Sequence, residues 1–187
     1  HIGLDHVDQP MRLLFSDIDN DGDLDLYALG RKQNWLAQND GDGTFSPIQS
    51  LALTGGQSPA AGLFADYDHD GDLDILTSDL DNVQFYRNIN DGRFEEATEA
   101  AGFTQNQTIG RDYWPRQPVG YGDFDLDGAL DIVALSTRGQ HHLYRNIRQG
   151  RWVDWTERMN LPNVAGVQVT LTGDFNNDGT MDLFWAG

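Results

Sequence analysis

The sequence contains no cysteine, which excludes disulfide bonds and thiolate metal sites. It has no run of 18 apolar residues, so it predicts no membrane-spanning helix, and its first residues do not form a signal peptide. The chain opens on His1 and not on methionine, so we expect it to be processed or cut from a longer product. The 187 residues are enough for one domain with a substantial core.

Basic residues are scarce, with 12 Lys and Arg against 30 Asp and Glu and a formal net charge of -18. The acidity is concentrated, because four nine-residue stretches hold 17 of the acidic residues and no Lys or Arg, which leaves 13 acidic residues elsewhere. No basic patch remains for a phosphate backbone, so nucleic acid is not an expected partner. The chain also lacks a Gly-x-Ser-x-Gly, a His-Glu-x-x-His and a phosphate loop. We therefore lean toward a non-catalytic protein and assign no catalytic residue.

The four acidic stretches share the template Asp-x-Asp/Asn-x-Asp-Gly-x-x-Asp. They read DIDNDGDLD at 17–25, DYDHDGDLD at 66–74, DFDLDGALD at 123–131 and DFNNDGTMD at 174–182. Positions 1, 5, 6 and 9 never vary and position 3 always keeps a side-chain oxygen, whereas position 7 drifts to Ala129 and Thr180. Calcium explains this pattern, because it takes roughly six to eight oxygen ligands, including a backbone carbonyl at position 7, with glycine at the sharp turn of position 6.

The pattern predicts up to four structural Ca2+ ions, one in each loop. The predicted ligands are Asp17, Asp19, Asp21, Asp23 and Asp25; Asp66, Asp68, Asp70, Asp72 and Asp74; Asp123, Asp125, Asp127, Ala129 and Asp131; and Asp174, Asn176, Asp178, Thr180 and Asp182. Magnesium fits less well, since it prefers strict octahedral geometry with several retained waters. The fourth loop has the fewest carboxylates and is expected to be the weakest site. The alternative interpretation is a solvated acidic turn without an ion.

The loops recur within a longer unit. Their first aspartates lie 49, 57 and 51 residues apart, and apolar runs rich in β-formers flank each loop. An asparagine follows 22 or 23 residues after the first aspartate, at Asn39, Asn88 and Asn146, inside a hairpin pattern with a glycine-containing turn. A unit of four antiparallel strands over roughly 50 residues is the blade of a β-propeller, whereas the repeats of a β-helix are much shorter. The sequence therefore predicts an all-β propeller fold.

The motifs also carry a family resemblance. The loops, followed by "NDGDGTF" or "LYRN"-like hairpins, resemble the FG-GAP and VCBS repeats of integrin-α-type propellers, and the tails "FEEATEAAGF" and "WVDWTERMNL" are similar to those of bacterial and animal proteins related to cartilage acidic protein. The resemblance implies a calcium-binding module that mediates extracellular protein or glycan binding or adhesion. It also implies seven blades, of which about three and a half are present here. Weak calcium sites fill outside the cell, so we expect an extracellular, cell-surface or periplasmic location.

The repeat predicts the division of the chain. We expect the tail of a preceding blade at 1–10, a blade at 11–58, a blade at 59–116 with an inserted loop near 103–117, a blade at 117–165 and an incomplete blade at 166–187.

The inserted loop is a candidate ligand site, because loops on a rigid scaffold often carry function. Its side chains are of types enriched at binding hot spots, namely Arg111, Tyr113, Trp114 and Arg116. The alternative is that the two aromatic residues pack against a neighbouring blade. Two other functions stay open: the propeller portion of a secreted polysaccharide lyase or other polysaccharide-active enzyme, and a lectin that stacks sugars on Trp114.

Overall fold

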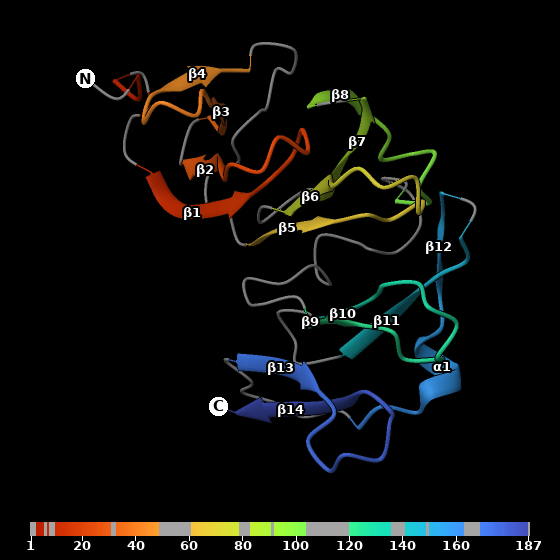
Figure 1. Cartoon of the computed structure of the whole chain (residues 1–187). Helices are drawn as coiled ribbons and strands as arrows, with labels where there is room; N and C mark the ends of the chain where they lie inside the picture. The colour runs from red at the N-terminus through yellow and green to blue at the C-terminus, as the bar shows by residue number, and fades with distance from the viewer. Residues whose placement is uncertain are drawn as a thin grey trace. The chain divides into compact units, whose positions relative to one another are not determined.

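The structure is a computed structural model (Figure 1). It describes residues 3–5, 7, 10–30, 33–48, 61–78, 83–90, 92–103, 120–135, 141–148, 150–162 and 169–186. Over these residues the chain forms strands and a single four-residue helix. It divides into two compact units, one of residues 1–66 and 70–97 and the other of residues 67–69 and 98–187. Each unit is described by itself.

The first unit contains two four-stranded antiparallel sheets (Figure 1). The first sheet consists of β1 (Pro10–Ser16), β2 (Asp25–Gly30), β3 (Trp35–Asn39) and β4 (Phe45–Pro47). The second consists of β5 (Ala61–Ala65), β6 (Asp74–Ser78), β7 (Val83–Asn90) and β8 (Arg93–Glu96). In both sheets every strand pairs with the next one along the chain, so each sheet is a meander made from one sequence repeat.

The second unit repeats this plan with a four-stranded and a two-stranded sheet. The four-stranded sheet consists of β9 (Gly120–Gly122), β10 (Asp131–Leu135), β11 (His141–Asn146) and β12 (Trp152–Asp154), and the two-stranded sheet of β13 (Val169–Gly173) and β14 (Asp182–Ala186). In the chain, the helix α1 (Thr156–Met159) lies between β12 and β13, and its C-terminal cap, Asn160, has a left-handed backbone conformation. This helix, within the tail "WVDWTERMNL", is a detail that the strand pattern did not predict.

The core of the first unit draws on the acidic loops as well as on the strands. Its buried cluster comprises Ile18, Tyr27, Leu29, Leu36, Ile75, Tyr86 and Phe94. Ile18 stands at position 2 of the first acidic loop, between two aspartates, and is fully buried. Burying such a side chain contributes about 1.5–3 kcal/mol. The loop is thus held to the sheets by an apolar side chain, while the carboxylates of Asp21 and Asp23 stay exposed.

The first strands of successive sheets lie against each other within each unit, β1 against β5 and β9 against β13. Gly62 on β5 allows this approach, because a Cβ there would lie 2.6 Å from Leu14 Cδ1 and 3.0 Å from Leu29 Cδ1. Contact between the first strands of neighbouring meanders is the packing of propeller blades.

The prediction of an all-β fold built from four-stranded antiparallel blades is therefore confirmed. None of the helices in the described part of the chain is long and apolar enough to cross a membrane.

Candidate metal centres in the strand-connecting loops

Each acidic stretch connects the first two strands of its sheet, and its first aspartate folds the loop back on itself. The Asp17 carboxylate accepts hydrogen bonds of 3.1 Å from the backbone amides of Asp21 and Gly22. The corresponding amides of the third and fourth loops donate to Asp123 and Asp174 over 2.7–3.0 Å. The same local bonds thus hold the first, third and fourth loops in one backbone conformation.

Two positions in every loop have a left-handed backbone. The glycines at position 6, which are Gly22, Gly71, Gly128 and Gly179, have φ between 86° and 100°. The sequence predicted this sharp turn. Position 4 is also left-handed, with φ between 59° and 63°, and is occupied by Asn20, His69, Leu126 and Asn177. Asparagine tolerates this region better than leucine does. The requirement at position 4 was not foreseen from the sequence, because its residue types differ in character.

The first three loops bring carboxylates together. Three oxygens lie within 4.8 Å of one another in each loop, from Asp17, Asp19 and Asp25, from Asp66, Asp68 and Asp70, and from Asp123, Asp125 and Asp127. All nine are ligands predicted from the sequence. In the fourth loop the side chains of Asp174, Asn176 and Asp178 are exposed, and the Asn176 amide donates to Asp178 over 3.0 Å.

These clusters meet the requirements of a hard cation. The Oδ1 atoms of Asp19 and Asp66 are buried yet have no hydrogen-bond partner, and a buried oxygen without a partner costs free energy. Burial, together with the neighbouring charge of Asp21, raises the pKa of Asp19 above its usual range. A divalent cation among these oxygens would satisfy them and offset their mutual repulsion. The residues present therefore fit calcium.

The aspartate at position 9 has a further role that the sequence did not reveal. Asp25 is fully buried. Its two carboxylate oxygens accept hydrogen bonds from the backbone amides of Ile18, at 2.9 Å, and of Asn39, at 2.8 Å. Asp131 accepts the amides of Phe124 and Asn146 in the same way, over 3.0 and 2.8 Å. Position 9 thus ties its loop to the third strand of the sheet. Burial raises the pKa of Asp131 to about 6, with Asp125 and Asp127 adding to the effect.

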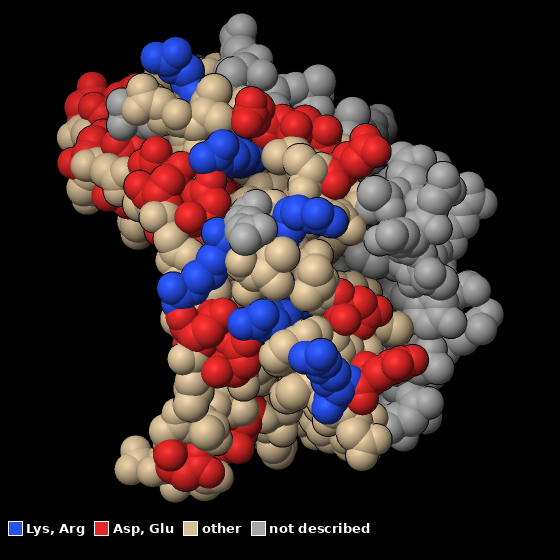
Figure 2. All heavy atoms as spheres, turned by 90° about the vertical axis from the view of Figure 1, so that its right-hand side faces the viewer, with Lys and Arg blue, Asp and Glu red and all other residues tan. Residues whose placement is uncertain are grey.

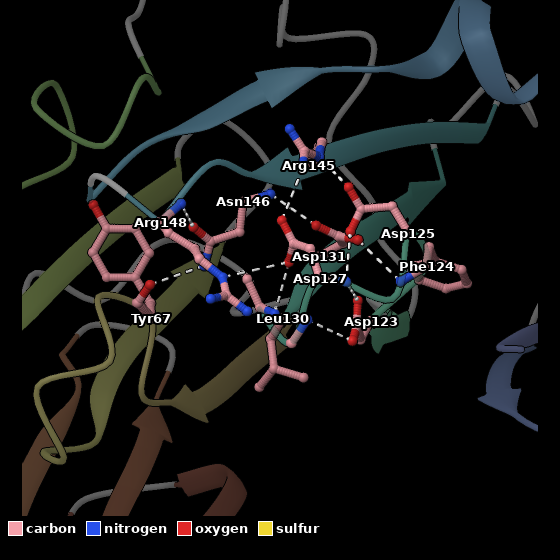
Figure 3. Close-up of polar contacts among 12 residues, drawn as sticks. Tyr67, Asp123, Phe124, Asp125, Asp127, Leu130, Asp131, Arg145, Asn146 and Arg148 are labelled. Atoms are coloured by element: carbon pink, nitrogen blue, oxygen red, sulfur yellow. Dashed lines mark hydrogen bonds and ion pairs between the residues drawn. The ribbon is translucent and has the colours of Figure 1, made fainter. Parts of the chain in front are cut away.

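In the second and third repeats, the repeated asparagine also binds the acidic loop of the preceding repeat. The Asn88 side-chain amide donates over 2.8 Å to the carbonyl of Ile18, at position 2 of the first loop. The Asn146 amide donates over 2.9 Å to the carbonyl of Tyr67, which is position 2 of the second loop (Figure 3). Both asparagines are fully buried. The sequence identified the repeated asparagine but not this connection, because its partner lies 70 or 79 residues away.

The residue before each asparagine reaches a loop carboxylate. Gln38 donates to Asp19, and Arg87 forms a 3.3 Å ion pair with Asp70. Arg145 binds Asp125 and also Asp127, the latter over 2.8 Å (Figure 3). The bond to Asp125 raises the pKa of Arg145 above its usual value.

Figure 2 shows acidic side chains in separate groups on the face that it draws, with basic side chains interspersed among them.

Other candidates from the sequence take no part in these clusters. Arg111, Tyr113, Trp114 and Arg116, the candidate ligand loop, lie outside the described residues. Glu95, Glu96, Glu99 and Glu157 are exposed, as carboxylates on a solvated face are expected to be.

Meandering four-stranded blades with an Asp-rich loop between their first two strands define a propeller repeat protein. Residues 17–77, 75–134 and 123–185 each match the FG-GAP-like repeat, and the chain belongs to this family. The predicted resemblance to FG-GAP propellers is confirmed.

Two individual proteins show what the chain is similar to. Human cartilage acidic protein 1 is 29% identical over 104 residues, which are 54% of this chain and 14% of that protein. A solved structure of an Agrocybe aegerita lectin, described as recognising non-reducing terminal N-acetylglucosamine, superposes on 95% of this chain with a TM-score of 0.65 and 19% identity. The match covers 47% of the lectin chain, so the chain spans less than half of either relative.

Proposed function

We propose that the chain is a non-catalytic propeller module whose acidic loops bind structural calcium and whose blades present a surface to an extracellular glycan or protein. The calcium part depends on one observation: Asp19 and Asp66 each have a buried oxygen without a hydrogen-bond partner, and each residue also has a carboxylate oxygen within 4.8 Å of oxygens of two other aspartates. Side-chain oxygens at alternating positions supply a calcium ion with most of its ligands. The metal would hold each loop rigid between two strands.

The first experiment measures the effect of calcium on stability. Because a ligand of the native state alone stabilises it by mass action, each site contributes about 2.7 kcal/mol at a hundredfold excess over its dissociation constant. We expect calcium to raise the melting temperature, chelation to lower it and magnesium to have a much smaller effect. A melting temperature that is the same with calcium and with chelator would refute the calcium assignment.

A variant separates binding in the loop from a general charge effect. Asp19→Asn removes a crowded carboxylate, so it should raise the calcium-free melting temperature and reduce the calcium response. Asp42→Asn is the matched control, because Asp42 is an exposed aspartate of the β3–β4 hairpin outside the predicted ligand set. It should leave the calcium response unchanged.

Glycan binding is favoured by the similarity in fold to the lectin. The test is a glycan panel that contains N-acetylglucosamine-terminated and uronic-acid-containing oligosaccharides, probed with and without calcium. Binding of the protein to a glycan of the panel that occurs only in the presence of calcium supports the binding module. Formation of unsaturated or reducing ends on the uronic-acid substrates would instead favour the polysaccharide-active alternative. Absence of binding across the panel, with binding to an extracellular protein partner, would restrict the proposal to adhesion between proteins.

A further inference from the structure

One position on the third strand of each of the three four-stranded blades faces the acidic loop of that blade. It is occupied by Gln38, Arg87 and Arg145, and each side chain binds a carboxylate at position 3 or 5 of the loop. We infer that this position sets the calcium affinity of its loop, and that Arg145 is a resident cation that makes the third site weaker than the first. The inference rests on the proposed calcium function and goes beyond it by naming the residues that distinguish the sites.

The first three loops differ strongly in formal charge when the side chains that face each loop are included. The first loop has five carboxylates and faces the neutral Gln38, so its formal charge is -5. The second has five carboxylates and faces Arg87, which leaves -4. The third has four carboxylates and faces Arg145 and also Arg148, whose Nε lies 3.7 Å from Asp127, which leaves -2. Calcium affinity depends on the number of ligand charges. We therefore expect the first loop to bind calcium most tightly, the second less tightly and the third least tightly.

Arg145 is held in place by two kinds of contact. Its guanidinium binds Asp125 and Asp127 (Figure 3), and its Cζ also lies 4.7 Å from the centre of the Trp155 ring. A guanidinium over an indole face makes a favourable cation–π contact. Because both partners fix the side chain beside the loop, its charge stays close to any ion that enters.

Burial makes this charge effective. The side chains of Arg145 and Asp125 are 26% and 14% exposed, whereas those of Arg87 and Asp70 are 40% and 35% exposed. Solvent and salt screen partly buried charges less than exposed ones. Repulsion between the guanidinium and a divalent ion is therefore expected to be larger in the third loop than in the second. A guanidinium stays protonated at every physiological pH, so the effect does not switch off.

The same contact has two opposite consequences. Without calcium, Arg145 offsets the repulsion among the carboxylates of the third loop and stabilises the fold. With calcium, it occupies carboxylate oxygens and repels the ion. Gln38 holds Asp19 by a hydrogen bond without adding charge, so the first loop lacks both effects. Exchanging the two residue types should therefore exchange the behaviour of the two loops.

The experiment uses the whole chain with Arg145→Gln and Gln38→Arg, and calcium titrations followed by NMR. The amides of Gly22 and Gly128 report on their own loops, since each donates to the first aspartate of that loop. Arg145→Gln should tighten calcium binding at Gly128 at least tenfold while it lowers the calcium-free melting temperature. Gln38→Arg should weaken binding at Gly22 by a similar factor.

Arg158→Gln is the matched control. Its guanidinium also lies over Trp155, 5.2 Å from the ring centre, and within the described part of the chain it makes no ion pair with a loop carboxylate. It removes the same charge and should leave both titrations unchanged.

The outcomes separate this inference from the proposed function. If neither glycine amide of the original chain responds to calcium at about 10 mM, above the range of extracellular modules, the calcium function itself fails. If both amides respond but Arg145→Gln only lowers the melting temperature, the arginine is merely structural and the inference is overturned. If Arg145→Gln does not fold, Gln38→Arg decides alone: an unchanged midpoint at Gly22 overturns the inference.

Discussion

The side-chain amide of Asn88 lies 2.8 Å from the main-chain carbonyl oxygen of Ile18, and this hydrogen bond connects the third strand of one blade to the acidic loop of the blade before it. Asn88 also donates to the carbonyl of Leu73 over 3.3 Å, and its own backbone amide donates to Asp74 over 2.8 Å. One fully buried residue thus satisfies polar groups in two loops. Removing its amide would leave buried carbonyls without a donor.

Asn88→Ala is therefore expected to destabilise the protein by about 2–4 kcal/mol, since each abandoned buried acceptor costs about 1–3 kcal/mol. Urea unfolding in the presence of calcium measures this loss. Asn39→Ala provides the comparison, because Asn39 holds the same place in the first repeat but is only partly buried, and among the described residues its side-chain amide donates only to the Leu24 carbonyl, over 3.2 Å. It should cost less than about 1 kcal/mol. Equal losses at both positions would show that the bond to Ile18 contributes little.

The blades could be predicted from the sequence because a nine-residue template recurs four times at intervals near 50 residues, with apolar runs on both sides. Local chemistry decides these features, since the glycine turn and the alternating oxygens lie within a single loop. The clustering of Asp17 with Asp19 follows from the same local pattern.

The partners of Asn88 and Arg145 could not be predicted in the same way. The bond from Asn88 spans 70 residues and depends on how neighbouring sheets pack. The pairing of Arg145 with Asp125 depends on strand register, because a shift by one residue would turn the arginine to the opposite face of β11. Nothing in the spacing of arginine and aspartate along the chain contains this information.

Leu126 is strained by its place in the third loop. It is 59% exposed and has φ of 59°, a left-handed conformation that costs a branched side chain about 1–2 kcal/mol. Asn20 and Asn177 occupy the same position in other loops at φ of 60° and 59°. Leu126→Asn is expected to raise the free energy of unfolding by about 1 kcal/mol, as measured by urea denaturation.

The control for this gain is Leu24→Asn. Leu24 is 57% exposed, and its φ does not lie in the left-handed region. If Leu24→Asn stabilised the protein as much as Leu126→Asn does, the gain would come from removing exposed apolar surface, and backbone strain would be rejected as its cause.

Stability of the calcium-free protein should decrease as the pH rises from about 5 to 7. Burial, with the charges of Asp125 and Asp127, raises the pKa of Asp131 from 3.8 to about 6, while the amides of Asn146 and Phe124 offset part of the rise. The folded state therefore binds this proton more tightly than the unfolded chain does. The resulting stability is fully present below pH 3.8 and is lost as the pH passes through about 6. Two pKa units correspond to roughly 3 kcal/mol, which sets the upper limit of the effect.

Urea unfolding of calcium-depleted protein at several pH values between about 5 and 7 measures this slope, and Asp131→Asn should flatten it whatever its effect on absolute stability. Asp42→Asn should leave the slope unchanged, because hydrogen bonds from Thr44 lower the pKa of Asp42 and it titrates below this range. Saturating calcium should also flatten the slope in the original chain, since a bound cation favours the ionised carboxylates of the third loop. A slope that persists in Asp131→Asn would assign the titration to another group and remove Asp131 from the explanation.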